Sequence, residues 1–75
     1  MRAVYRLQEP IIAIHPVSER GHTLRAVPRH MILEVVGDPQ KSGLVDVLWD
    51  GQHIAVFIQD LKSRGELVEI SETGQ

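Results

Sequence analysis

The sequence contains no cysteine, no long hydrophobic run and only three aromatic residues, Tyr5, Trp49 and Phe57. Without thiols, no disulfide can brace the 75 residues, and the four scattered histidines match no usual spacing of zinc ligands. No stretch approaches the roughly 20 apolar residues that a membrane-spanning helix needs. The first six residues lack the apolar core of a signal peptide. We therefore expect a cytoplasmic protein that uses no cofactor or metal and contacts no membrane.

The scarcity of aromatic residues also limits the ligands that the chain can recognise. Proline-rich peptides dock into aromatic-lined grooves, methyl-lysine needs an aromatic cage, and single-stranded nucleic acid stacks on aromatic platforms. Sequence motifs of catalysis are missing too: there is no G-x-S-x-G elbow and no glycine-rich phosphate loop. We expect a non-catalytic protein. Catalysis remains an alternative only at a site shared between two subunits, in which His30 or His53 would lie beside a carboxylate of a second chain.

The strongest pattern is a predicted β-hairpin within residues 43–58. Asp50-Gly51 separates two β-rich runs, and a type I′ turn needs positive φ at both of its central residues, which Asp-Gly tolerates. With these two residues as the loop, residue 49 lies opposite residue 52 and the other pairs follow in step. Side chains alternate between faces, so one face is an apolar core. It carries Val45, Val47, Trp49, Ile54 and Val56, and the other face carries Leu44, Asp46, Leu48, His53, Ala55 and Phe57.

The segments on both sides of this hairpin give weaker signals. Pro10 and Pro16 cannot donate ladder hydrogen bonds, so they confine the strand between them to an edge, a bulge or strand ends. We expect a loop over residues 18–23. Beyond the hairpin, Asp60 can cap a single helical turn that Gly65 closes in the left-handed region. Further strands are predicted over residues 3–8, 11–15, 23–27, 31–36 and 66–70.

This succession of elements predicts an all-β fold, a small five- to six-stranded antiparallel barrel with one short helical turn, in which closure removes free edges. From residue 31 to residue 70 the layout resembles the SH3-like barrel. The resemblance implies a long first loop near residues 15–30, a tight distal hairpin at the Asp-Gly turn and one helical turn before the last strand. It does not extend to a ligand groove, because no position matches the acidic, tyrosine-rich motif of SH3 domains. Residues 1–75 form one domain, with 71–75 expected to fray.

The mixed face of the hairpin is the first candidate site. If nothing covers its apolar side chains, they form a patch of the kind that marks protein contacts, and a symmetric homodimer is the commonest solution. The other possibility is that the N-terminal strand, with Tyr5 and Leu7, covers part of this face. The candidate interface residues are Leu44, Asp46, Leu48, His53 and Phe57.

Charge is divided unevenly along the chain and gives the second candidate site. Five arginines and two glutamates in residues 1–30 give +3, whereas three basic and eight acidic residues in 31–75 give −5. The two halves can attract each other within the fold or between copies, or the basic part can bind nucleic acid or another anion. The pI of about 6.0 opposes a dedicated nucleic-acid binder. The residues for this alternative are Arg20, His22, Arg25, Arg29 and His30.

Overall fold

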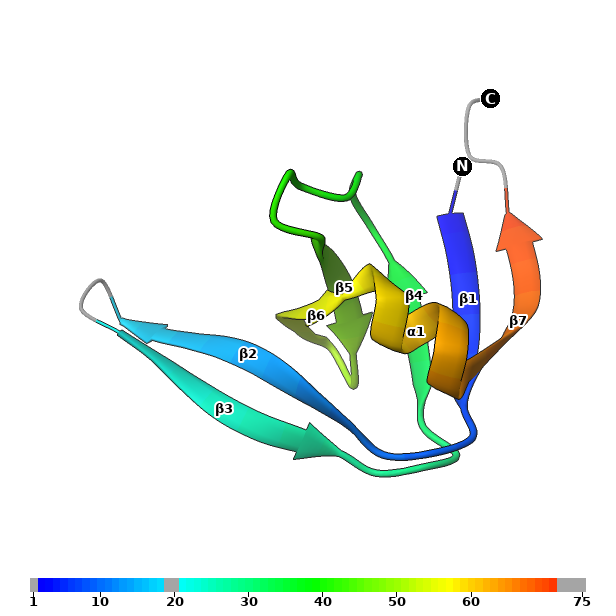
Figure 1. The fold of residues 1–75 in the computed structure, drawn as a ribbon, viewed down its shortest axis with the longest axis horizontal. Coiled ribbons are helices and arrows are strands. Elements are labelled where there is room, and N and C mark those ends of the chain that lie inside the picture. Colours follow the sequence, from blue (N-terminus) through cyan, green and yellow to red (C-terminus); the bar gives the residue numbers. More distant parts are fainter. Residues whose placement is uncertain (1, 19–20, 72–75) are drawn as a thin grey trace.

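The computed structural model describes residues 2–18 and 21–71, which form one antiparallel sheet and one short helix (Figure 1). The sheet has seven strands in the order β3-β2-β6-β5-β4-β1-β7. In chain order the elements are β1 (Arg2–Leu7), β2 (Ile11–Ser18), β3 (Gly21–Val27), β4 (Ile32–Val35), β5 (Leu44–Trp49), β6 (Gln52–Phe57), α1 (Ile58–Arg64) and β7 (Gly65–Ser71).

The predicted central hairpin is confirmed residue by residue. Trp49 lies opposite Gln52, and the register continues in step to Leu44 opposite Phe57. Asp50 and Gly51 have φ values of 52° and 77°, the positive angles that a two-residue hairpin turn requires. The alternation of faces that follows from the turn therefore holds for the whole length of β5 and β6.

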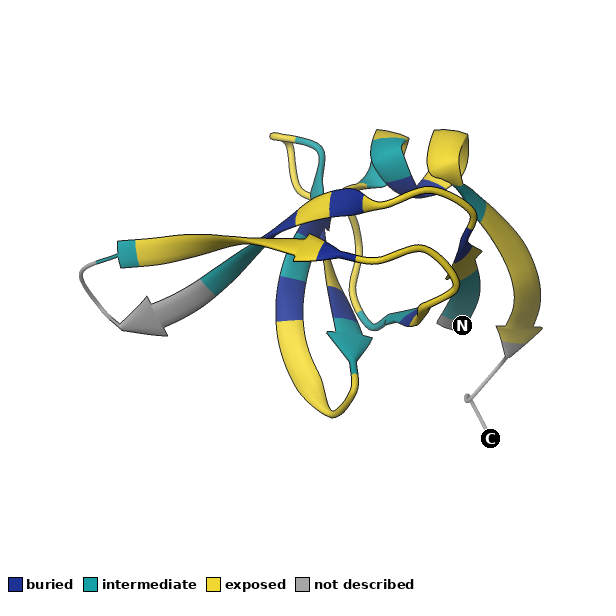
Figure 2. Cartoon of the chain, turned by 90° about the horizontal axis from the view of Figure 1, so that it is seen from below, coloured by how far each residue is buried: buried dark blue, intermediate teal, exposed yellow. Residues whose placement is uncertain are grey.

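The core lies on one side of the sheet, where the predicted inner face of the hairpin meets the other strands. Val45, Val47, Ile54 and Val56 are buried as expected, whereas Trp49 is half-buried and packs against the cluster. The core is entirely apolar within the described residues, and Figure 2 shows its dark-blue positions distributed over several strands and the helix. Its other members are Leu7, Ile11, Ala13, Val27, Leu33 and Leu61.

The expectation of a closed five- or six-stranded barrel is wrong, because the sheet is open and has seven strands. The segment expected to be a loop near residues 15–30 is instead a long hairpin, in which β2 and β3 pair from Ile11 opposite Val27 outward. One pair of residues, Ile14 and Ala55, joins β2 to β6 in the ladder, and beyond it the hairpin extends away from the body (Figure 1). The hairpin thus lengthens the sheet rather than closing it, and β3 and β7 remain as its edges.

The helix also differs from its prediction. It begins at Ile58 rather than Asp60, and Phe57 occupies the N-cap position without a side-chain hydrogen bond. Asp60 lies in the first turn, where its negative charge is favoured by the partial positive charge of the helix N-terminus. Gly65 has an extended φ of −119°, not a left-handed one, and a Cβ there would lie 2.7 Å from the carbonyl oxygen of Leu61. Glycine is therefore required here by close backbone approach.

The C-terminal strand ends later than expected. Ser71, which was assigned to a fraying tail, pairs with Arg2 in the ladder between β7 and β1, and residues 72–75 lie outside the described part of the chain. None of the helices in the described residues is long and apolar enough to cross a membrane.

Candidate contact surface

The outer face of the central hairpin carries all five predicted interface residues on one side of β5 and β6. Phe57 has 45% of its surface exposed, and Asp46 and His53 are exposed as well. Leu44 and Leu48 are half-buried. The structure therefore brings the predicted residues together on a partly open apolar face, although Phe57 is the only one of its three large apolar side chains that is exposed.

Strand β2 continues this face beyond the hairpin, which sequence reasoning missed. Ile14 lies directly opposite Ala55, so the two side chains share the outer face, and Ile12 follows on the same side of β2. On β3, Leu24 lies opposite Ile14 and is therefore on the same face. Ile12 and Leu24 are 52% and 70% exposed. We define the outer apolar face as Ile12, Ile14, Leu24, Leu44, Leu48, Ala55 and Phe57.

The N-terminal strand does not cover this face. Tyr5 lies opposite Leu33, which is fully buried, so Tyr5 and Leu7 project toward the core side of the sheet. Leu7 is completely buried, and Tyr5 packs against the core. Strand β1 lies inside the sheet between β4 and β7, and this position keeps it from folding across the outer surface.

An open hollow of about 450 Å³ adjoins the outer apolar face at Phe57. The hollow lies between the loop that precedes β5 and the start of α1, so it combines an aromatic ring with charged groups of both signs. Such a depression can receive a side chain from a partner that docks on the neighbouring face. Its lining residues are Lys41, Ser42, Gly43, Phe57, Ile58, Gln59 and Asp60.

The predicted basic segment is distributed along a strand instead of being gathered in a loop. His22 and Arg25 belong to β3, where an odd separation places their side chains on opposite faces. Arg29 and His30 follow in the turn before β4, and Arg20 lies outside the described residues. Binding of nucleic acid or another anion by this segment stays a prediction.

Arg25 makes contacts within the chain that explain its position. Its guanidinium lies 4.8 Å from the centroid of the Trp49 ring, and Nη1 donates a hydrogen bond to Oε1 of Gln52 at 3.0 Å. A cation over an indole face at this distance is attracted by the ring quadrupole. Arg25 therefore ties β3 to the end of the central hairpin, across a junction where the ladder supplies a single residue pair.

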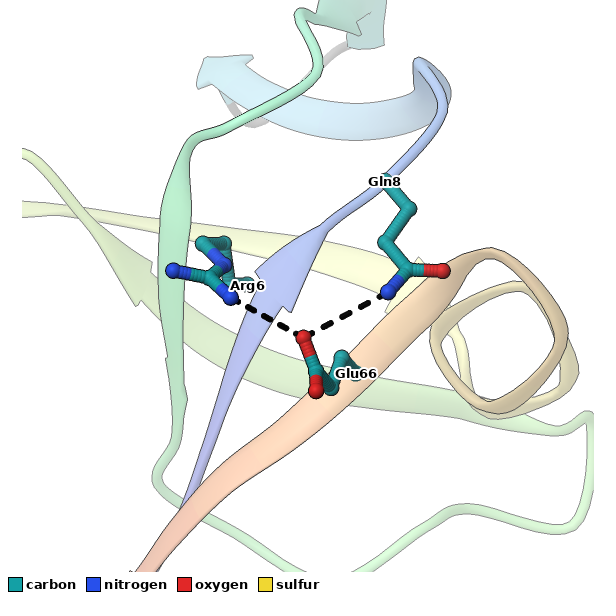
Figure 3. Close-up of polar contacts among 3 residues, drawn as sticks. All are labelled: Arg6, Gln8 and Glu66. Carbon is teal, nitrogen blue, oxygen red and sulfur yellow. Dashed lines mark hydrogen bonds and ion pairs between the residues drawn. The ribbon is translucent and has the colours of Figure 1, made fainter.

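The two oppositely charged halves of the sequence also meet within the fold. Nη2 of Arg6 donates to Oε1 of Glu66 at 3.0 Å, and Nε2 of Gln8 donates to the same oxygen at 3.4 Å (Figure 3). Arg64 lies 3.9 Å from Glu9. These pairs are on the surface, where ion pairs contribute little free energy, so they fix orientation more than stability.

The described residues offer little for metal or covalent chemistry. Within residues 2–18 and 21–71, no three or more His, Asp and Glu side chains lie close enough together to hold a metal ion. Ser42 lines the hollow beside Phe57, and its hydroxyl oxygen accepts a long 3.4 Å bond from the backbone N–H of Leu44. No protein-family model, no curated protein and no solved structure matches the chain.

Proposed function

We propose that the protein is a non-catalytic contact module that binds protein through the outer apolar face, and that its first partner is a second copy of itself. The observation that carries the proposal is the exposure of Ile12, Leu24 and Phe57 on one face of the sheet, at 52%, 70% and 45%. Full burial of such a side chain stabilises by roughly 1.5–3 kcal/mol, and a contact would recover the exposed share of that energy. Exposed apolar patches on small proteins mark surfaces of this kind.

Self-association is the partner choice that the size of the domain supports. A chain of 75 residues buries a small core, and oligomerisation is a common way for scaffolds of this size to gain stability. A two-fold contact places the same patch on both sides, so each large apolar side chain is buried twice in the assembly. Asp46 lies between Leu44 and Leu48 on β5 and opposite Ala55, and His53 lies opposite Leu48. Both polar side chains are exposed inside the patch, so a second copy must offer each a polar partner.

The test is the solution mass of the wild-type protein and of two matched variants. We expect light scattering to give a mass above 8.4 kDa for the wild type, rising with concentration. Phe57→Glu places a charge in the patch and should lower the mass. The control is Ile32→Glu: Ile32 is 49% exposed on the same side of the sheet but lies in β4, opposite Arg6. A wild type that stays monomeric, or a Phe57→Glu variant with the wild-type mass, contradicts the proposal.

We further propose that the architecture is an opened relative of the SH3-like layout. Support comes from the strand order β7-β1-β4-β5-β6, the two-residue turn of the central hairpin and the helix directly before the last strand. In this interpretation the β2–β3 hairpin takes the place of the long first loop. An experimental structure in which β6 pairs with β7, or in which α1 is displaced from that junction, would contradict it.

A further inference from the structure

The open sheet ends in two edge strands that nothing covers. In β3, residues 22–26 are all exposed, and in β7 residues 66–70 are all exposed. The two strands lie at opposite ends of the molecule, with β3 on the hairpin that extends away from the body (Figure 1). Natural edge strands are commonly protected by lysine, by proline or by a β-bulge. Neither β3 nor β7 contains lysine or proline, and β7 has a register shift between Leu67 and Glu69.

The directions of the backbone N–H and C=O groups can be followed across the sheet from β4 to β3. They show that Leu24 points its own N–H and C=O to the free side of β3. Val36 donates to the carbonyl oxygen of Asp46 at 3.0 Å, so Asp46 directs its amide groups toward β4 and away from β6. Ala55, opposite Asp46, therefore directs its own groups toward Ile14 of β2. The backbone N–H and C=O of Ile14 therefore point toward β6. Those of Leu24, its partner on β3, point away from β2.

The same reasoning applies to Leu67 on the other edge. Leu7 donates to the carbonyl oxygen of Met31 at 2.9 Å and accepts from the N–H of His30 at 2.7 Å, so its amide groups face β4. Alternation gives Tyr5, two residues earlier, the same direction. Leu67 lies opposite Tyr5 and therefore directs its N–H and carbonyl away from β1, to the free side of β7.

We propose that copies of this chain join head to tail, with β3 of one copy pairing antiparallel to β7 of the next and Leu24 opposite Leu67. This register follows from the amide directions, because two outward-facing residues must lie opposite each other to exchange hydrogen bonds. It also places Arg25 opposite Glu66. The count ends at Leu67, because β7 has an extra residue, Val68, between the partners of Tyr5 and Val4, so Glu69 lies on the other face from Leu67 and directs its amide groups toward β1. The alignment thus matches one apolar pair and one pair of opposite charges.

Glu66 has capacity for this contact. Both hydrogen bonds that it accepts within the chain end on Oε1, as Figure 3 shows, so Oε2 has no partner among the described residues. Arg25 uses one of its five N–H donors on Gln52. A second copy can therefore add contacts without breaking those already present.

Charge disfavours the two symmetric ways of pairing the same edges. Joining β7 to β7 around Leu67 brings an acidic strand against an identical acidic strand, and joining β3 to β3 brings Arg25 near its own copy. Like charges in such positions are destabilising, so the edge contact is heterologous. A heterologous contact leaves one free edge at each end and can continue into a ring or an open chain of copies.

Two proline variants and their mixture test this arrangement. Leu24→Pro and Leu67→Pro each remove one outward-facing N–H at a site where the ladder within the chain loses no bond. Both are made in the Phe57→Glu background, which removes the face contact, and we expect light scattering to show each variant alone as a single chain. An equimolar mixture should give a pair of twice 8.4 kDa and nothing larger, because the intact β7 of one variant meets the intact β3 of the other. A variant that alone keeps the mass of the Phe57→Glu parent, or a mixture that stays at one chain, overturns the proposal.

Charge exchange tests the register with side chains that are exposed and leave the backbone unchanged. Arg25→Glu and Glu66→Lys should each weaken association roughly two- to fivefold, and the double variant should restore it, because the pair is then reversed. A double variant no better than its parents overturns the register, even if the proline variants fail to fold.

The same measurements separate this inference from the proposed use of the outer apolar face. If Phe57→Glu alone already has the mass of one chain, the face contact stands and the edge contact is wrong. If Phe57→Glu keeps the wild-type mass and the added proline substitutions lower it to one chain, the edge contact stands and the face contact is wrong. If Phe57→Glu lowers the mass to a value above one chain and the proline substitutions lower it further, both contacts stand.

Discussion

Replacing Gly51 with alanine tests the turn on which the central hairpin depends. Gly51 has φ of 77°, and a Cβ built there meets no atom within 4 Å, so backbone strain is the only folded-state cost of the substitution. The left-handed region costs an alanine about 1–2 kcal/mol. The smaller entropy of the unfolded alanine chain offsets about 0.4–1 kcal/mol of this. We expect Gly51→Ala to lower the free energy of unfolding by about 1 kcal/mol.

Gly21→Ala is the matched control, because a Cβ at Gly21 also meets nothing within 4 Å but its φ is not in the left-handed region. In a strand, alanine is favoured over glycine by about 0.5–1 kcal/mol, so this variant should be equally stable or more stable than the wild type. Urea unfolding followed by the fluorescence of the single tryptophan measures both. In thermal unfolding, the midpoint temperatures of the two variants should differ by roughly 4–8 °C for each kcal/mol of difference in their free energy of unfolding. Equal stabilities of the two variants would refute the reasoning.

Three further comparisons between variants test other contacts by the same unfolding measurement. Leu33→Ala should lower the free energy of unfolding by about 2–5 kcal/mol, because Leu33 is fully buried. Leu24→Ala, at a site 70% exposed, should change it by less than about 0.5 kcal/mol. Similar losses in the two variants would contradict the assignment of faces. Arg25→Met should cost about 0.5–1 kcal/mol, and this loss should vanish in a Trp49→Leu background; additive losses would show that the ring contact contributes nothing. Glu66→Gln should cost at most about 1 kcal/mol, and the difference from wild type should shrink in about 1 M salt, where charges are screened; a loss unaffected by salt would argue against an ionic contact with Arg6.

The central hairpin could be predicted from sequence because its determinants are local. The Asp-Gly turn fixes the register, and the register fixes both faces, so every pair from residue 49 opposite 52 onward follows from two adjacent residues. The candidate interface residues were predictable for the same reason. Their degree of exposure was not, because it depends on which strand lies beside β6, and that contact joins residues far apart in the sequence.

Pro16 is the reason why the sequence does not predict the full length of the β2–β3 hairpin. A proline is expected to limit a strand, yet β2 continues to Ser18 with Pro16 opposite His22. Residue 16 has the same backbone direction as Ile14 and faces the β6 side, where the ladder extends no further than the pair with Ala55. The missing N–H therefore takes no hydrogen bond from the β2–β3 ladder. A rule about proline in strands depends on which side of the strand the nitrogen faces, and sequence alone does not supply that side.

The incorrect prediction of a closed barrel and the existence of the candidate contact surface have a common cause. A barrel of this size would need β3 or β7 to fold back and pair with another strand, which would bury the edge amides. Instead, the β2–β3 hairpin pairs with β6 only at Ile14 and Ala55 and then extends away from the rest of the sheet. Leu24 therefore stays exposed, and β3 and β7 keep backbone N–H and C=O groups that point outward. The position of the β2–β3 hairpin also places Ile12 and Leu24 beside the outer face of the central hairpin. Their exposed side chains enlarge an apolar patch for which β5 and β6 alone would supply only Phe57 as an exposed large side chain. The feature that prevents closure is thus also the feature that leaves the outer apolar face and the edge of β3 exposed.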